Sequence, residues 1–289
     1  MTTFATDLKF PEGPVALPDG SYLVVEGGRG CVTQISRDGQ SKRIIAVTGE
    51  PNGLAVDKAG AIWVADIRPP ALIRLTMDGT FERVLTECHG ERFLFPNDLC
   101  FGPDGALYLT DSGVLANDLA PNGVISQEWM KLKMDGRLYK VDVSTMAIEK
   151  LDSGFQCING IAFSSEQDLY VNETVTGLIY RYRWKDDRII GSREVFGNVN
   201  LPGDPSVFRG PDGMAFDVHG NLYVAVYAQG DITILGEDGR VIKRIATRGN
   251  QPTNVCFGLP GEKRIYVTEY EHGCVECFDV DAEGLPLWS

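Results

Sequence analysis

The sequence predicts an all-β fold, a six-bladed β-propeller with a central metal site, and three observations support this prediction. One pattern recurs six times along the 289 residues. Each unit consists of short β-branched and aromatic runs bounded by Asp, Gly and Pro, which is typical of strands joined by hairpins. The units recur at intervals of roughly 40 residues, as the blades of propellers do. Five of the six units also carry Glu, Asn or Asp at one equivalent position.

Each unit opens with a tripeptide that begins with Pro or Ile. These openings are Pro11-Glu12-Gly13, Pro51-Asn52-Gly53, Pro96-Asn97-Asp98, Ile158-Asn159-Gly160, Pro211-Asp212-Gly213 and Pro252-Thr253-Asn254. An apolar run, a turn and two further runs follow each opening. In the first unit these are Val15-Ala16, Pro18-Asp19-Gly20, Tyr22–Glu26 and Val32–Ile35.

The repeat runs from Pro11 to Phe278 without a linker, which predicts one domain over residues 1–289. Closure of the ring is expected to pair residues near Thr3–Lys9 with Val275–Val280. The longest interval between openings contains residues 112–136, which lack strand alternation and include Trp129. We expect this insertion to form a lid or a wall over one end of the channel, with Trp129 beside the substrate. A surface loop packed on a blade edge is the alternative.

The composition excludes several classes of partner. The chain carries 27 basic and 40 acidic residues, a net charge of −13, and its densest basic cluster is Lys131-Leu132-Lys133. Nucleic acid and anionic membranes are therefore not expected as partners. No run approaches the ~20 apolar residues of a membrane span, and the start of the chain lacks a secretory pattern, so a cytoplasmic location is expected. The seven cysteines do not form a disulfide framework, and Cys274-Val-Glu-Cys277 lies in a predicted strand, which suits neither zinc nor a redox pair.

The second residue of each opening predicts the functional site. Equivalent positions of a repeat arranged around an axis converge on that axis. Oxygen ligands with two negative charges among them suit a hard divalent cation. A turn cap would explain any one of these residues, but a cap does not require the change from Asn to Glu or Asp. The converging residues are Glu12, Asn52, Asn97, Asn159 and Asp212, while Thr253 is expected to line the axis without binding the ion.

A second acidic position ends the second run of five units. We interpret these carboxylates as structural groups that accept hydrogen bonds from turn amides or neighbouring blades. They are Glu26, Asp66, Asp111, Glu173 and Glu269. Among the histidines, His272 follows the second run of the last unit, where it lies either in a surface loop or near the channel.

Four stretches in order resemble the SMP-30/gluconolactonase/luciferin-regenerating enzyme family. They are Phe10-Pro-Glu-Gly-Pro14, Pro96-Asn-Asp98, Asn159-Gly160, and Gly210-Pro-Asp-Gly-Met-Ala-Phe-Asp217 followed by Asn221-Leu-Tyr-Val-Ala-Val226. The resemblance covers essentially the whole chain. It implies a six-bladed propeller that hydrolyses a small-molecule lactone with one divalent metal ion. Ca²⁺ is the first expectation, and Zn²⁺, Mg²⁺, Mn²⁺ and Fe²⁺ are the alternatives. The metal ligands that it implies are Glu12, Asn97, Asn159 and Asp212.

The resemblance also implies the catalytic roles. By this resemblance Asp212 would act as the general base. From the residues alone, we expect Asp98 to be the weaker candidate for the base and Asn52 to contact the substrate. Sugar lactonases of the family often carry Arg two residues before the third-blade Asn, where this chain has Phe95. We therefore expect a less polar or aromatic lactone. The alternatives are a phosphotriesterase, a lyase or isomerase on a related propeller, and a binding propeller whose ion is structural.

Overall fold

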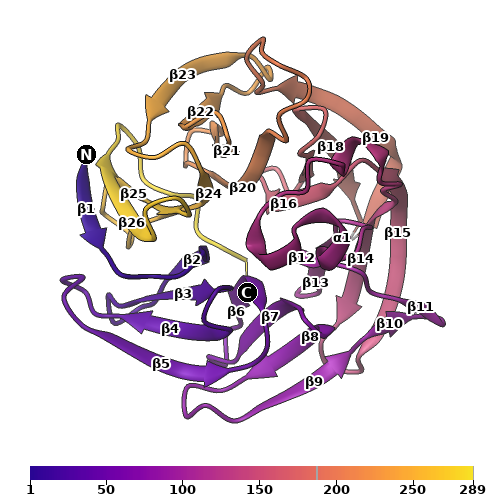
Figure 1. Ribbon diagram of the computed structural model, residues 1–289, viewed down its shortest axis with the longest axis horizontal. Helices are drawn as coiled ribbons and strands as arrows, with labels where there is room; N and C mark the ends of the chain where they lie inside the picture. The colour runs from indigo at the N-terminus through magenta and orange to yellow at the C-terminus, as the bar shows by residue number, and fades with distance from the viewer. Residues whose placement is uncertain (187, 289) are drawn as a thin grey trace.

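Six four-stranded antiparallel sheets surround a common axis in the computed structural model, which describes residues 1–186 and 188–288 (Figure 1). This arrangement confirms the all-β, six-bladed propeller that the repeat predicts. Each blade begins beside the axis with the strand that carries the opening tripeptide, and the following strands lie successively further out. The openings of all six units are therefore brought to the centre of the ring.

The strands of each blade, from the axis outwards, have the following bounds. Blade 1 contains β2 (Pro11–Ala16), β3 (Tyr22–Glu26), β4 (Cys31–Ile35) and β5 (Lys42–Val47). Blade 2 contains β6 (Pro51–Val56), β7 (Ile62–Ile67), β8 (Pro70–Leu75) and β9 (Phe81–Leu85). Blade 3 contains β12 (Pro96–Phe101), β13 (Leu107–Asp111), β14 (Gly136–Asp142) and β15 (Ala147–Phe155). Blade 4 contains β16 (Ile158–Phe163), β17 (Leu169–Glu173), β18 (Leu178–Lys185) and β19 (Arg188–Asn198). Blade 5 contains β20 (Gly210–Phe216), β21 (Leu222–Tyr227), β22 (Asp231–Leu235) and β23 (Val241–Ala246).

Blade 6 takes its outermost strand from the start of the chain. It contains β24 (Pro252–Phe257), β25 (Arg264–Glu269), β26 (Cys274–Asp279) and β1 (Thr2–Ala5). Strand β1 pairs with β26, with Thr2 opposite Cys277 and Ala5 opposite Val275. The pairing confirms the closure expected from the sequence. It holds the ring together by backbone hydrogen bonds between segments about as far apart in sequence as the chain allows.

Among the described residues, one apolar cluster lies between each pair of neighbouring blades, and a seventh packs the insertion around Trp129. Trp63 of blade 2, for example, packs with Leu107 and Tyr139 of blade 3. Both faces of the second strands are covered by neighbouring blades, and β3 and β7 are buried along their whole length. This explains why these runs are continuously apolar in sequence instead of alternating.

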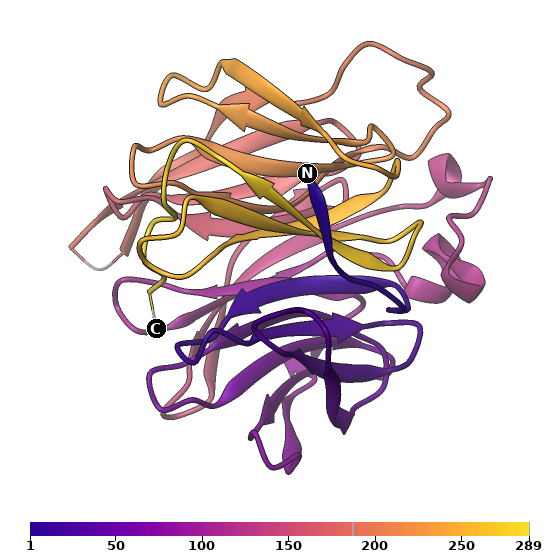
Figure 2. The same cartoon turned by 90° about the vertical axis from the view of Figure 1, so that its left-hand side faces the viewer.

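Residues 112–136 and the C-terminal segment lie on opposite faces of the ring (Figure 2). The insertion contains the helix α1 (Ala116–Leu119) and the 3₁₀ turns η1 (Pro121–Gly123) and η2 (Trp129–Lys131). On the other face, the Leu285 amide donates to the Phe216 carbonyl, and Trp288 packs against the clusters on both sides of blade 3. A short hairpin of β10 (Glu87–Cys88) and β11 (Glu91–Arg92) precedes blade 3. No helix in the described part of the chain is long and apolar enough to cross a membrane.

Candidate metal centre and substrate cavity

The second residue of every opening lines one cavity at the centre of the ring. The strand that carries each opening shows an irregular register with its neighbour at the opening itself, as between Pro96 and Leu99 in blade 3. Such irregularities re-aim side chains at the end of a strand. The converging residues are Glu12, Asn52, Asn97, Asn159, Asp212 and Thr253. The expected convergence is therefore present, and it includes Asn52 and Thr253.

Two carboxylates of this set are buried close together. Glu12 and Asp212 are 7% and 9% exposed. Burial raises the pKa of Glu12 well above its ordinary value, and the charges of Asp212 and Asp98 raise it further. The pKa of Asp212 is raised by burial and then by the charge of Asp98. Buried carboxylates without a counter-charge resist ionisation, so this group of residues favours a bound cation.

The two buried amides of the set are oriented by hydroxyl groups. The Asn97 side-chain nitrogen donates to Ser112 Oγ at 2.9 Å, and the Asn159 nitrogen lies 3.4 Å from Thr174 Oγ1. Asn52 Nδ2 donates to Asn97 Oδ1 at 3.2 Å. Because hydroxyl groups engage the amide nitrogens, the atoms that Asn97 and Asn159 can offer to a cation are their oxygens.

The chemistry of this set fits a hard divalent cation. No three His, Cys, Asp or Glu side chains converge into a metal cluster within residues 1–186 and 188–288. A cation at the centre of the ring would be held by the carboxylates of Glu12 and Asp212 and the amide oxygens of Asn97 and Asn159. A set made only of oxygen atoms is preferred by Ca²⁺ and similar ions. The residues present thus fit the ion that the sequence predicts.

Asp98 does not line the cavity. It is 8% exposed, and its Oδ1 accepts the Leu99 amide at 2.9 Å. Burial raises the pKa of Asp98 to about 7. The charge of Asp98 raises the pKa of both Glu12 and Asp212. Unlike Asp98, Asp212 lines the cavity. Of the two predicted bases, Asp212 is the one that can face a bound substrate.

The insertion forms part of the cavity wall. Ser112, Ala116, Leu119, Ala120, Gly123 and Ile125 all contribute to it. The insertion is tied to blade 6 by the Tyr270 hydroxyl, which donates to the Gly123 carbonyl at 2.7 Å. It is tied to blade 2 by Arg68 Nη2, which donates to the Ala120 carbonyl at 3.3 Å. These contacts place the segment over the channel, as either a wall or a lid requires.

The two aromatic residues predicted to contact substrate lie in different places. Phe95 lines the cavity. Trp129 is buried outside the lining, where its Nε1 donates to the Ser206 carbonyl at 2.9 Å and its ring meets Phe208 edge to face at 5.3 Å. Phe208 does line the cavity, so Trp129 supports the wall from behind.

The cavity that the ring of polar residues lines has a volume of about 130 Å³, and five aromatic side chains contribute to its wall. The Phe10 and Tyr270 rings stack with centroids 4.2 Å apart. Tyr227 lies between Tyr270 and Phe208, with centroids 6.5 Å from each. Burial raises the pKa of Tyr227 to about 12, so its hydroxyl stays protonated. One side of the wall is thus a connected aromatic belt, defined here as Phe10, Tyr270, Tyr227 and Phe208.

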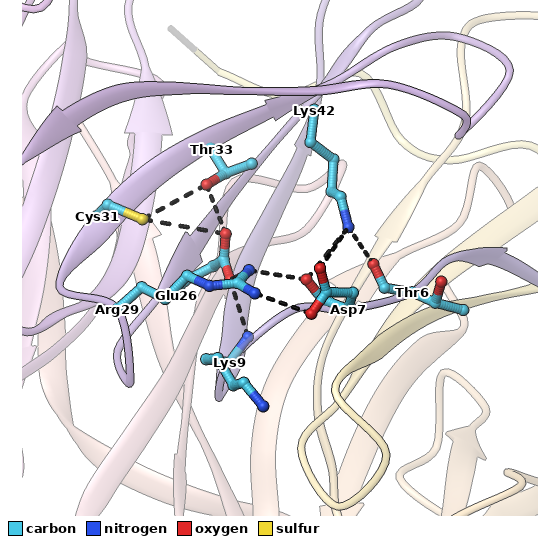
Figure 3. A network of polar contacts seen from close by, with 8 residues as sticks. All are labelled: Thr6, Asp7, Lys9, Glu26, Arg29, Cys31, Thr33 and Lys42. Atoms are coloured by element: carbon cyan, nitrogen blue, oxygen red, sulfur yellow. Dashed lines mark hydrogen bonds and ion pairs between the residues drawn. The ribbon is translucent and has the colours of Figure 1, made fainter.

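The five carboxylates that end the second run of their units, called the acidic column from here on, are structural, as expected from the sequence. Glu26 accepts hydrogen bonds from the Lys9 amide at 2.8 Å and from Thr33 Oγ1 at 2.7 Å, and it pairs with Arg29 (Figure 3). Asp111 likewise accepts the amides of Leu94 and Phe95. The equivalent carboxylates of blades 2, 4 and 6 accept the amides of Glu50, Gln156 and Gln251. Each therefore fixes the residues that precede an opening.

The residue after each of these five carboxylates also lines the cavity, as does the residue after Val226, the equivalent position of blade 5; neither was anticipated from the sequence. These residues are Gly27, Ile67, Ser112, Thr174, Tyr227 and Tyr270. The sequence could have predicted these residues, because they occupy the next position of the same repeat. Four residues just before an opening, Phe10, Glu50, Phe95 and Cys157, complete the wall. His272 is exposed and lies outside the lining, so the surface-loop alternative applies to it.

Comparisons with known proteins agree with this architecture. The family model described as SMP-30/gluconolactonase/LRE-like region matches residues 10–271. The diisopropyl-fluorophosphatase of Loligo vulgaris is 31% identical over 98% of this chain and 93% of its own length. The gluconolactonase of Zymomonas mobilis is 29% identical over 89% of this chain and 76% of its own. A solved gluconolactonase from Xanthomonas campestris shares the fold, with a TM-score of 0.80 at 22% identity, over 98% of this chain and 89% of its own. This chain belongs to the SMP-30/gluconolactonase/LRE-like family.

Proposed function

We propose that this protein is a hydrolase that opens a lactone with one divalent metal ion, most simply Ca²⁺. The observation that carries the proposal is that two buried carboxylates and two oriented amides line the same cavity as five aromatic side chains. The relatives named gluconolactonase and lactonase support the reaction class. A metal ion bound by Glu12, Asn97, Asn159 and Asp212 would supply a Lewis acid for the ester carbonyl.

The chain's own residues then have separate tasks. Asp212 accepts the proton of the attacking water as general base. In the metal-free protein burial raises the pKa of Asp212, and a bound cation would favour the ionised carboxylate that accepts the proton. The belt of Phe10, Tyr270, Tyr227 and Phe208 packs against the apolar part of the substrate and excludes bulk water, and Phe95 does the same from blade 3.

The substrate that fits this wall best is a less polar or aromatic lactone. Phe95 takes the place of the Arg that the resemblance associates with sugar hydroxyls, and the apolar side chains of Ile67, Leu119 and Ile125 extend the same surface. We further propose that residues 112–136 act as the lid of the cavity and that Asn52, which donates to Asn97, keeps that amide in place.

The test is hydrolysis of an aliphatic, a sugar and an aromatic lactone by chelator-treated protein, with Ca²⁺, Zn²⁺, Mg²⁺, Mn²⁺ or Fe²⁺ added back. We expect metal-restored turnover that Asp212→Ala abolishes. No turnover with any metal, in folded protein that binds one ion, would contradict the proposal.

Phosphotriester hydrolysis is the second candidate, because the diisopropyl-fluorophosphatase of Loligo vulgaris is similar to this chain over nearly its whole length. The same cavity would accept apolar ester groups around a phosphorus centre. Including one phosphofluoridate or phosphotriester in the panel decides between the two reactions by their relative kcat/KM.

A further inference from the structure

One ion pair interrupts the apolar wall of the cavity. Glu50 and Arg68 of blade 2 both line it, and Arg68 Nη1 lies 3.0 Å from Glu50 Oε2. Both side chains are partly buried, with 32% of Arg68 and 23% of Glu50 exposed. Neither residue belongs to the ring that could hold a metal.

The guanidinium of Arg68 has unused hydrogen-bonding capacity. Nη1 is engaged by Glu50, and Nη2 makes only the 3.3 Å contact with the Ala120 carbonyl. Nε is buried and has no hydrogen-bond partner among the described residues. A buried donor without a partner costs stability. In a cavity wall, a ligand oxygen is a natural partner for such a donor.

The pair also supplies the cavity with a guanidinium group, which the third blade lacks because it has Phe95. Phe95 removes the guanidinium expected there, yet Arg68 brings one to the same cavity from the neighbouring blade. The backbone holds the pair in place, because Asp66 Oδ1 accepts the amides of Glu50 and Arg68 at 2.9 and 3.1 Å. Both side chains are thus anchored through one carboxylate of the acidic column.

We propose that Glu50 and Arg68 form a polar subsite that selects lactones carrying a hydroxyl group on an otherwise apolar body. This inference rests on the proposed lactonase function and specifies its substrate class. A hydroxyl can accept a hydrogen bond from Arg68 and donate one to Glu50. The aromatic belt, which runs through blades 1, 6 and 5, would hold the apolar body.

The charge balance favours a neutral hydroxyl over a carboxylate. Glu50 and Arg68 cancel each other, and Glu12 and Asp212 together match the charge of one divalent ion. A substrate carboxylate beside Arg68 would also face the Glu50 carboxylate, and like charges held close together in a partly buried site repel. A hydroxyl uses both members of the pair without adding a charge.

The test compares dihydrocoumarin with its ring-hydroxylated and ring-carboxylated derivatives in the wild type, Arg68→Met and Glu50→Gln. In the wild type we expect a higher kcat/KM for a hydroxylated lactone than for the parent or the carboxylated one. Arg68→Met should reduce kcat/KM for the hydroxylated lactone about 10- to 100-fold, mainly through KM, as expected for the loss of a hydrogen bond to a charged group. The parent compound, which has no hydroxyl to bond to Arg68, should lose much less kcat/KM than the hydroxylated lactone.

A matched control separates recognition from structural support. Arg83→Met removes another blade 2 guanidinium that donates to a backbone carbonyl, that of Thr48, but Arg83 lies outside the cavity lining. It should leave the preference for the hydroxylated lactone intact. Glu50→Gln keeps the shape of the side chain, so it tests the pair even if Arg68→Met lowers the melting temperature.

The outcomes distinguish this inference from the proposed function. Equal losses for all three lactones in Arg68→Met would assign the pair to anchoring the insertion at Ala120 and overturn the subsite. A wild-type preference for the parent or the carboxylated lactone would also overturn it while leaving lactone hydrolysis in place. Hydrolysis of none of the lactones by metal-loaded wild type would overturn both.

Discussion

Ser112 fixes the orientation of Asn97. Its hydroxyl accepts the Asn97 side-chain nitrogen at 2.9 Å and donates to the Ile158 carbonyl of the next blade, also at 2.9 Å. Thr174 repeats the arrangement one blade later, with Asn159 and the Pro211 carbonyl. The two amides that would bind the ion are thus each held by a hydroxyl, which is in turn held by the following blade.

Removing one of these hydroxyls should weaken metal binding without disturbing the fold. Ser112→Ala frees the Asn97 amide to rotate, and we expect metal affinity to fall about 10- to 100-fold, as for other groups that orient metal ligands. Isothermal titration of metal-stripped protein measures the change. Ser164→Ala, in the blade 4 hairpin between β16 and β17, is the matched control and should leave affinity unchanged. An unchanged affinity in Ser112→Ala would refute the orienting role.

Removing a carboxylate of the acidic column should instead lower the stability of the fold. Asp111→Ala leaves the amides of Leu94, Phe95 and Gly113 without their carboxylate partner. We expect a loss of roughly 3 kcal/mol in the free energy of unfolding, because buried donors are left unpaired. Urea denaturation measures it. Asp142→Ala, at an exposed hairpin turn, should have a much smaller effect, and equal effects of the two variants would contradict the interpretation of the column.

The metal-free protein should lose stability as the pH rises. The pKa of Asp98 is about 7 in the fold, and those of Glu12 and Asp212 are also raised, each first by burial. Because the unfolded chain releases these protons at lower pH, raising the pH from about 4 to 7 favours unfolding. A bound divalent cation offsets this by stabilising the ionised forms. The gap in melting temperature between metal-loaded and stripped protein should therefore widen from pH 5 to pH 8, and a constant gap would argue against a cation at these carboxylates.

Phe95 should set the preference for less polar lactones. It lines the cavity, and its amide is held by Asp111, so its backbone position is fixed. We expect aromatic lactones to have a higher kcat/KM than gluconolactone, and Phe95→Arg to narrow the difference by adding donors for hydroxyl groups. A steady-state comparison of the two substrates measures this. Equal or better turnover of gluconolactone by the wild type would contradict the prediction.

The sequence alone predicts the repeat, the closure of the ring and the convergence of the central residues. A repeat around an axis makes these features geometric consequences of position, and the pairing of Thr2 with Cys277 and the cavity lining confirm them. The acidic column, which includes Asp111, was also interpreted correctly, because a carboxylate at a strand end commonly binds turn amides.

The wall of the cavity was less predictable. Trp129 was expected beside the substrate, but the insertion folds so that Trp129 supports Phe208 from behind. Arg68 was not singled out, because it lies between two strands of blade 2 and outside every repeated position. Side chains contributed by turns and insertions depend on tertiary packing, which the period of the repeat does not determine.

The most direct test of the account measures lactone hydrolysis as metal-stripped protein is titrated with Ca²⁺, while native mass spectrometry counts the bound ions. The account predicts that activity toward an aromatic lactone rises with the first bound ion and reaches its maximum at one ion per chain. It also predicts that Asp212→Ala abolishes this rise. Full activity in protein free of metal, or an undiminished rise in Asp212→Ala, would contradict the central claim.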